Sequence, residues 1–302
     1  MSQEDAEATL LGKETEYKFL YNPAILVAVP RQENRTGINI KDGDLPFVGV
    51  DVWNAYEIST ITEKGVPFAG FAKIVYPCDS EFLIESKSLK LYLNSFNMSR
   101  FGETTSDALV ILQAKIAEDL SKVLKTGVQV TVFDAGWESE AFINPVLNSS
   151  IDLDATIAPD MECTAYNEDS SILEIEDALL GIRDEVHSHV LRSNCKITHQ
   201  PDWGSVYIVY TSPVGKITWE SLFKYLVSMR GENHFHEEIC EAIYKRLYDL
   251  LQPTELVVAC FYTRRGGIDI NPVRALSNKD IETCGLSDYI DSNQISPKTA
   301  RQ

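Results

Sequence analysis

Long apolar runs and a secretory signal are both missing from the 302-residue sequence. No apolar run approaches the roughly 20 residues that cross a bilayer, and residues 1–5 lack the basic and apolar regions of a signal peptide. Hydrophobic residues nevertheless make up 44% of the chain, which is enough to build the cores of two domains. We therefore expect a globular, cytoplasmic protein without membrane attachment.

Metal-type cysteine spacing, excess positive charge and a Rossmann fingerprint are also missing. None of the cysteines at 78, 163, 195, 240, 260 and 284 forms a C-x-x-C pair, so we expect neither a metal site nor a disulfide framework. A formal net charge of −18 argues against a general nucleic-acid surface, which needs Lys and Arg. No Gly-x-Gly-x-x-Gly follows a strand-like run, so any dinucleotide would be held without a Rossmann domain.

What the sequence contains is a repeated order of elements. Strand-like runs at 47–59 and 68–76 predict a hairpin. A first helix is expected from near 87, where Ser86 could be the cap, and a second from 106–107 to Gly127. A strand is expected at 128–133. The second half repeats this order, with strands at 187–192 and 206–210, helices at 218–229 and 237–250, and a strand at 255–262. Residues 88–95 and 221–228 share five of eight residues at an offset of 133.

The repeat predicts an α+β protein built from two antiparallel modules. We place the first at residues 1–150, including an acidic N-terminal tail, and the second at residues 151–302, including an acidic connector. Antiparallel modules of this kind leave open sheet edges, and pairing between chains would cover them. We therefore expect an oligomer.

Cys195 and Asp202 lie in a polar stretch, residues 193–204, between two strand-like runs of the second module. Pro201 and Gly204 are typical of a turn there. A thiol can attack an electrophilic carbon, and a nearby acid can deliver the proton that the attack requires. The ordinary alternative is a buried structural cysteine and an aspartate that caps a turn.

Three further clusters each have a structural and a functional interpretation. Lys87 follows an expected helix start, which either is simply capped or binds a phosphate. Glu237 and Glu238 at the next helix start either cap it or accept two hydrogen bonds from a guanine-like edge. Arg265 precedes two glycines, either at an ordinary strand end or in a second phosphate clamp. The clusters are Ile84-Glu85-Ser86-Lys87-Ser88, Phe235-His236-Glu237-Glu238 and Thr263-Arg264-Arg265-Gly266-Gly267.

Together with Ser-Asn-Cys at 193–195 and Gln-Pro-Asp-Trp-Gly at 200–204, these motifs resemble the NADPH-dependent 7-cyano-7-deazaguanine reductases, the nitrile reductases of queuosine biosynthesis, a tRNA-modification pathway. The resemblance is to the long, two-module form and starts near residue 20. It implies tandem tunnelling-fold modules, each a four-stranded antiparallel sheet with two helices. It also implies a homodimer with active sites near module interfaces and no metal.

The resemblance further implies a four-electron reduction to 7-aminomethyl-7-deazaguanine with two NADPH. Cys195 would form a thioimide with the nitrile, and Asp202, protonated near neutral pH, would donate a proton to its nitrogen. The implied substrate-binding residues are Ile84, Glu85, Ser86, His236 and Glu237, and the implied NADPH-binding residues are Ser86, Lys87, Arg265 and Gly266.

Two alternatives stay open. A thiol-dependent nitrile hydrolase would share the thioimide but add water, and it would need a base near the thiol, for which His199 is nearest in sequence. A purine- or pterin-binding protein of the same fold would need no thiol at all. A related cyclohydrolase would need zinc ligands, whose spacing the sequence lacks.

Overall fold

The computed structural model describes residues 20–41, 43–134, 144–158, 160–176, 181–299 and 301–302. Residues 1–19 of the expected acidic tail and residues 177–180 of the expected connector lie outside these ranges. In the described part of the chain, no helix combines the length and the hydrophobicity that crossing a membrane requires.

The elements follow the expected order, with short additional elements before and between them and with a strand and two helices after the last predicted strand. The first half contains η1 (Pro23–Ile25), β1 (Ala28–Pro30), α2 (Gln32–Gly37), β2 (Val48–Ile61), β3 (Pro67–Pro77), β4 (Phe82–Ile84), α3 (Ser86–Asn94), α4 (Thr105–Leu124) and β5 (Gln129–Asp134). The connection contains α5 (Pro145–Ser149), β6 (Ile151–Asp152), α6 (Leu153–Thr156), η2 (Ser170–Ile172) and β7 (Ile175–Glu176). The second half contains β8 (Arg183–Ser188), β9 (Arg192–Cys195), β10 (Pro201–Thr211), β11 (Lys216–Ile217), α7 (Trp219–Ser228), η3 (Met229–Gly231), β12 (Asn233–His234), α8 (His236–Leu251), β13 (Glu255–Tyr262), β14 (Ile268–Ala275), α9 (Asn278–Thr283) and α10 (Ser287–Ile290).

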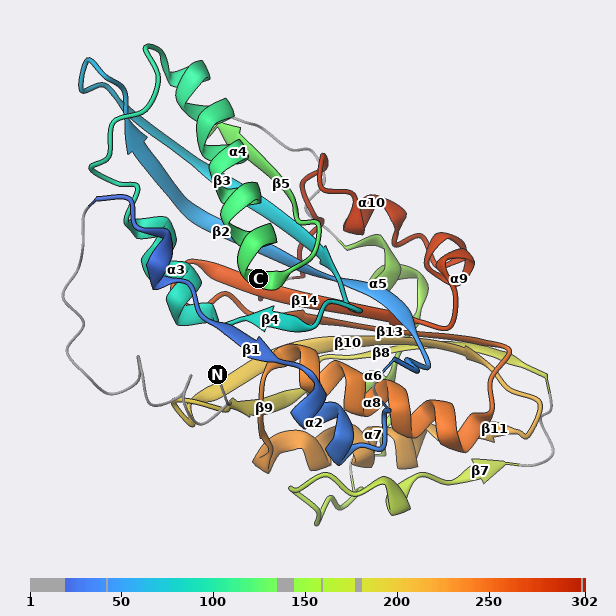
Figure 1. The fold of residues 1–302 in the computed structure, drawn as a ribbon. Helices are drawn as coiled ribbons and strands as arrows, with labels where there is room; N and C mark the ends of the chain where they lie inside the picture. The colour runs from blue at the N-terminus through green and yellow to red at the C-terminus, as the bar shows by residue number, and fades with distance from the viewer. Residues whose placement is uncertain (1–19, 42, 135–143, 159, 177–180, 300) are drawn as a thin grey trace.

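One long sheet runs through both halves of the chain (Figure 1). Its strands follow the order β12-β9-β10-β13-β14-β2-β3-β5, with β8 also paired to β10 and β6 to β8. Strand β14 joins the halves because it pairs antiparallel with β13 on one side and with β2 on the other. The α+β class with antiparallel strand pairing is confirmed, whereas β14 and the helices after it were not predicted.

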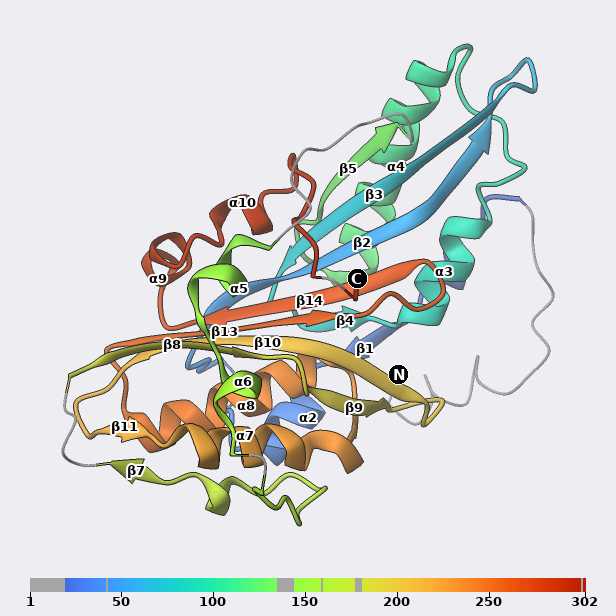
Figure 2. The same ribbon diagram turned by 180° about the vertical axis from the view of Figure 1, so that it is seen from behind.

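Both faces of this sheet are covered by helices. Helices α3 and α4 pack on the strands of the first half, and α7 and α8 pack on the same face in the second half (Figure 1). Helices α5, α9 and α10 cover the other face (Figure 2). In β10, Val206 and Ile208 therefore face α7 and α8, while Tyr207 and Val209 face the opposite layer. This two-sided burial explains why residues 206–210 of the strand form a continuous apolar run.

Two helix starts differ from the prediction. Glu85 rather than Ser86 caps α3, since its carboxylate accepts the N–H groups of Lys87 and Ser88 at 2.9 and 2.6 Å. Thr104, two residues before the predicted start, caps α4 in a reciprocal capping box with Asp107. The prediction looked for the usual hydroxyl cap at Ser86, and the Glu85 carboxylate takes its place.

A buried charge cluster ties the two halves together. Arg274 of β14 lies 2.8 Å from Asp51 of β2 and 2.9 Å from Glu241 of α8. Arg31 pairs with Asp51, and Arg35 of α2 lies 2.8 Å from Glu241. Because buried charges need close partners, these pairs fix the start of α8 against the sheet.

Candidate active site

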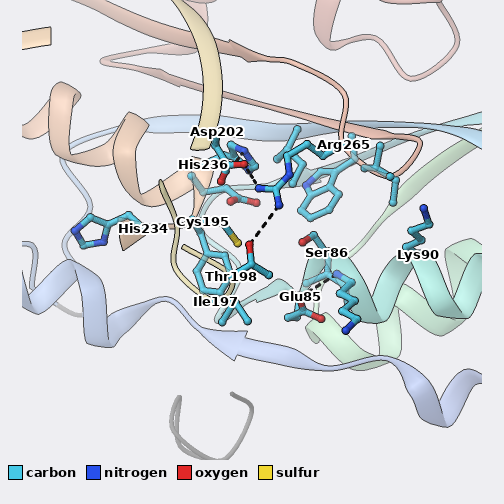
Figure 3. Close-up of a pocket in the computed structure, with 18 of the residues that line it drawn as sticks. Glu85, Ser86, Lys90, Cys195, Ile197, Thr198, Asp202, His234, His236 and Arg265 are labelled. Atoms are coloured by element: carbon cyan, nitrogen blue, oxygen red, sulfur yellow. Dashed lines mark hydrogen bonds and ion pairs between the residues drawn. The ribbon is translucent and has the colours of Figure 1, made fainter. Parts of the chain in front are cut away.

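A cavity of about 200 Å³ lies between the two halves of the chain, and all ten predicted site residues line it. Figure 3 shows Cys195, Asp202, His236 and Arg265 on one side, facing Glu85 and Ser86 across the opening. The ten are Ile84, Glu85, Ser86, Lys87, Cys195, Asp202, His236, Glu237, Arg265 and Gly266.

The β9–β10 hairpin brings Cys195 and Asp202 to the same wall. Asp202 pairs with Ser193 across the two strands, so only residues 196–200 form the connecting loop. Two backbone hydrogen bonds close this loop, from the Cys195 N–H to the Gln200 carbonyl at 2.8 Å and from the His199 N–H to the Cys195 carbonyl at 2.9 Å. His199 adopts a left-handed backbone, with φ of 55°, to complete the turn. The observed loop is therefore shorter than the predicted one, and Cys195 and Asp202 both lie on strands.

Asp202 is buried, with 3% of its surface exposed, and is ion-paired with Arg265. The same guanidinium donates to Thr198 Oγ1 at 3.3 Å (Figure 3) and to Gln200 Oε1 at 2.9 Å, and it also lies beside the Cys195 sulphur. A neighbouring guanidinium stabilises an ionised carboxylate. The structure therefore gives the predicted acid a strong cationic partner.

His236 faces the other carboxylate oxygen of Asp202, with Nε2 3.7 Å from Oδ2. Burial lowers the pKa of His236 to about 4. Its ring packs edge-on against the buried ring of Tyr262, with centroids 4.0 Å apart. His236 is therefore neutral at pH 7 and leaves Arg265 as the positive charge that balances Asp202.

Glu237 is the most isolated acid of the site. Its side chain is 1% exposed, and its Oε1 has no hydrogen-bond partner among the described residues. Burial, with Asp51 as a further cause, raises the pKa of Glu237 to about 8. Glu238, by contrast, accepts the Phe235 N–H at 3.1 Å and a bond from Lys196 at 3.2 Å. Glu238 therefore caps α8, and Glu237 offers its carboxyl to the cavity.

Positive groups gather at the opposite rim and in the turn after β13. Lys87 and Lys90 lie on the first turns of α3, next to Ser86. Gly266 has φ of 57°, and a Cβ there would come within 2.9 Å of Lys90 Nζ. The left-handed φ favours glycine, and the approach places the turn that carries Arg265 at the same edge as Lys90.

Comparison with known proteins shows the family of this chain. Residues 17–132 match the family model "Nitrile reductase, 7-cyano-7-deazaguanine-reductase N-term", and residues 201–280 match "QueF-like protein". The NADPH-dependent 7-cyano-7-deazaguanine reductase of Cupriavidus metallidurans is 39% identical over 276 residues, covering 90% of this chain and 94% of that protein. The chain belongs to the 7-cyano-7-deazaguanine reductase family.

Other members are equally similar. The reductase of the same name from an Azoarcus species is 41% identical, covering 91% of this chain and 92% of its own. The reductase from Rickettsia canadensis is 39% identical, and the match covers 89% of this chain and 93% of that protein. A solved structure, the archaeosine synthase QueF-Like in the apo form, covers 31% of this chain at 20% identity and a TM-score of 0.28, too low to support any argument.

The motifs that this chain shares with the 7-cyano-7-deazaguanine reductases did not include every residue of the cavity. Lys90 lies one helical turn after Ser86, and that spacing could have revealed it. Ile268 and Ile270 line the cavity from β14, a strand that the sequence did not predict. Trp53 also lines it, with a buried Nε1 that lacks a partner among the described residues. Across those same residues, no three His, Cys, Asp or Glu side chains are grouped to hold a metal ion.

Proposed function

We propose that the protein reduces the nitrile of 7-cyano-7-deazaguanine to the primary amine of 7-aminomethyl-7-deazaguanine with NADPH. Family membership supports the reaction and the cofactor. The single observation that carries the site assignment is that Cys195, Asp202 and Glu237 line one cavity, where Glu237 Oε1 has no hydrogen-bond partner among the described residues. A thiol, an acid and a purine anchor are the three groups that this reaction needs.

The substrate would be held by its guanine-like edge. An ionised Glu237 accepts two hydrogen bonds from the adjacent N–H and NH₂ groups of such a ring, which satisfies its isolated oxygen. His236 lies next to it in sequence, and Ile84, Glu85 and Ser86 would complete the base pocket from the opposite rim. Both oxygens of Glu85 already accept bonds from α3, so its contribution would be to shape the pocket.

The nitrile carbon would then react with Cys195. As the sulphur–carbon bond forms, one π bond of the nitrile breaks, its electron pair moves to nitrogen, and the nitrogen takes a proton from Asp202. The Asp202 carboxylate takes up the proton that leaves the thiol, so the net step adds S–H across the triple bond and gives a thioimide.

The cavity edge formed by the start of α3 and the turn after β13 fits a phosphate-rich cofactor. Lys87, Lys90 and Arg265 supply positive charge there, and the glycine at 266 allows close backbone approach. Ser86, Lys87, Arg265 and Gly266 would hold NADPH. Two NADPH molecules, bound in turn, would supply one hydride each, the first for the thioimide carbon and the second for the imine that remains after the thiol has left.

The arrangement of the modules and the oligomeric state complete the proposal. We assign residues 1–150 and 151–302 to two tunnelling-fold modules, each built on part of the shared sheet, in a cytoplasmic homodimer.

Nitrile hydrolysis is the weaker alternative because His199, the base nearest to Cys195 in sequence, is exposed and bonded to Asn233 at 2.8 Å.

Stoichiometry tests the function. Purified protein mixed with limiting 7-cyano-7-deazaguanine is expected to consume two equivalents of NADPH per nitrile, followed by NADPH absorbance, and to yield the primary amine by mass spectrometry. The Cys195→Ala variant is the control and should consume none. Folded wild-type protein that consumes no NADPH, or that releases an acid or amide, would remove the proposal.

A further inference from the structure

Arg265 is required in two places at once. The proposed function gives this guanidinium to a phosphate of NADPH. In the structure one terminal nitrogen, Nη1, pairs with Asp202, and the other, Nη2, donates to Gln200 at 2.9 Å and Thr198 at 3.3 Å. Both terminal nitrogens of the planar fork are therefore engaged on the β9–β10 hairpin.

We propose that Asp202 and the cofactor phosphate compete for Arg265, so that NADPH binds only by displacing Asp202 from the guanidinium. This inference rests on the proposed function. It makes Arg265 a positioning residue that acts on catalysis through Asp202, in addition to holding the cofactor.

Geometry makes the competition direct. Phosphates bind arginine through two parallel N–H groups. Nη1 already donates to Asp202, and Nη2 to Gln200 and Thr198, so a phosphate that uses this terminal pair has to displace them. The Arg265 backbone is fixed by reciprocal hydrogen bonds with Ile268 at 2.9 and 3.1 Å. The exchange therefore requires rotation of the side chain, 36% of which is exposed at the cavity edge.

Displacement would also change the charge of Asp202. Besides Arg265, the titratable groups that face it among the described residues are His236 on α8, Tyr262 on β13 and, beside the guanidinium, Cys195 on β9. His236 is neutral at pH 7, and burial raises the pKa of Tyr262 far above that pH. A 3%-exposed carboxylate that loses Arg265 has no second cation, which favours its protonated form. Cofactor binding would thus favour the acid form of Asp202 for the proton that each hydride step requires, whereas the thioimide can form beforehand with the proton that the Cys195 thiol gives up.

Equilibrium binding of NADPH at pH 7.5 tests the competition without turnover. Asp202→Asn is expected to bind NADPH about 3- to 10-fold more tightly than wild type, the range for removing a partly exposed ion-pair partner. Arg265→Met is expected to bind it more weakly, and adding Asp202→Asn to Arg265→Met should give no gain. Glu168→Gln is the matched control because it removes one negative charge from another arginine pair, 3.0 Å from Arg246 and away from the cavity.

Each outcome decides the inference. Tighter binding by Asp202→Asn together with lost turnover supports competition, since a merely structural role would not improve affinity. Equal or weaker binding overturns it, as does a gain that persists with Arg265→Met or that Glu168→Gln reproduces. Should Asp202→Asn fail to fold, calorimetry of wild type in buffers of different ionisation enthalpy replaces it: net proton uptake on NADPH binding supports the inference, and none overturns it. Wild type that binds no NADPH removes the proposed function itself.

Discussion

Affinity for the nitrile substrate is expected to rise with pH because of Glu237. The carboxyl is 1% exposed, and burial raises its pKa to about 8. Only the carboxylate can accept two hydrogen bonds from a guanine-like edge. Below pH 8 most of the protein therefore carries the form that cannot bind in this way, and binding must release a proton.

The size of the effect follows from the carboxylate fraction. With a pKa of about 8, the carboxylate fraction is about 3% at pH 6.5 and about 75% at pH 8.5. Apparent affinity scales with the competent fraction, so the dissociation constant should fall about 25-fold over this interval, or about 1.9 kcal/mol.

Calorimetry with 7-cyano-7-deazaguanine measures this directly. The Cys195→Ala background removes the covalent step and isolates binding. In that background Glu237→Gln should bind weakly with no pH dependence, because an amide does not titrate. Glu238→Gln, one position along and able to keep the α8 cap, should retain the full pH dependence. A dissociation constant that stays flat from pH 6.5 to 8.5, or a slope that survives in Glu237→Gln, would refute the reasoning.

Two further predictions concern stability, measured by urea unfolding. Lys73→Met should lower the free energy of unfolding by about 2–4 kcal/mol, because buried Lys73 donates to the carbonyls of Tyr289, Asp291 and Gln294 at 2.6, 2.6 and 2.9 Å. The control Lys122→Met, on the exposed side of α4, should change that free energy by less than about 0.5 kcal/mol. Equal losses in the two variants would contradict this role of Lys73. Glu241→Gln should cost about 3–5 kcal/mol by leaving Arg35 and Arg274 without their shared carboxylate, and an unchanged midpoint would show that the buried charge cluster does not hold the halves together.

Periodicity predicted the elements whose apolar residues recur at the regular spacing of a strand or a helix. The β2–β3 hairpin, α8 and β13 were found from alternating or helical apolar spacing, and β13 has the predicted bounds. Strand β14 was missed because Pro272 usually argues against a central strand and because Asp269 and Asn271 are polar although the strand is buried on both faces. Its polar side chains are satisfied by distant partners, as Asn54 donates to Asp269 at 2.7 Å.

The site residues were predicted better than their interactions. The motifs identified ten residues that line the cavity, because reactive side chains stand in short, distinctive segments. Sequence could not reveal the pairing of Asp202 with Arg265, 63 residues away, or that Glu238 rather than Glu237 caps α8. Both depend on which of several nearby groups the fold leaves without another partner, and that is decided by packing.

Intact-protein mass spectrometry tests most directly whether Cys195 attacks the nitrile. Wild-type protein incubated with 7-cyano-7-deazaguanine alone should gain the full mass of one substrate molecule, which is the thioimide. Cys163→Ala, which removes another partly exposed thiol, should gain the same mass, and Cys195→Ala should gain none. An adduct of that mass on Cys195→Ala would contradict the account.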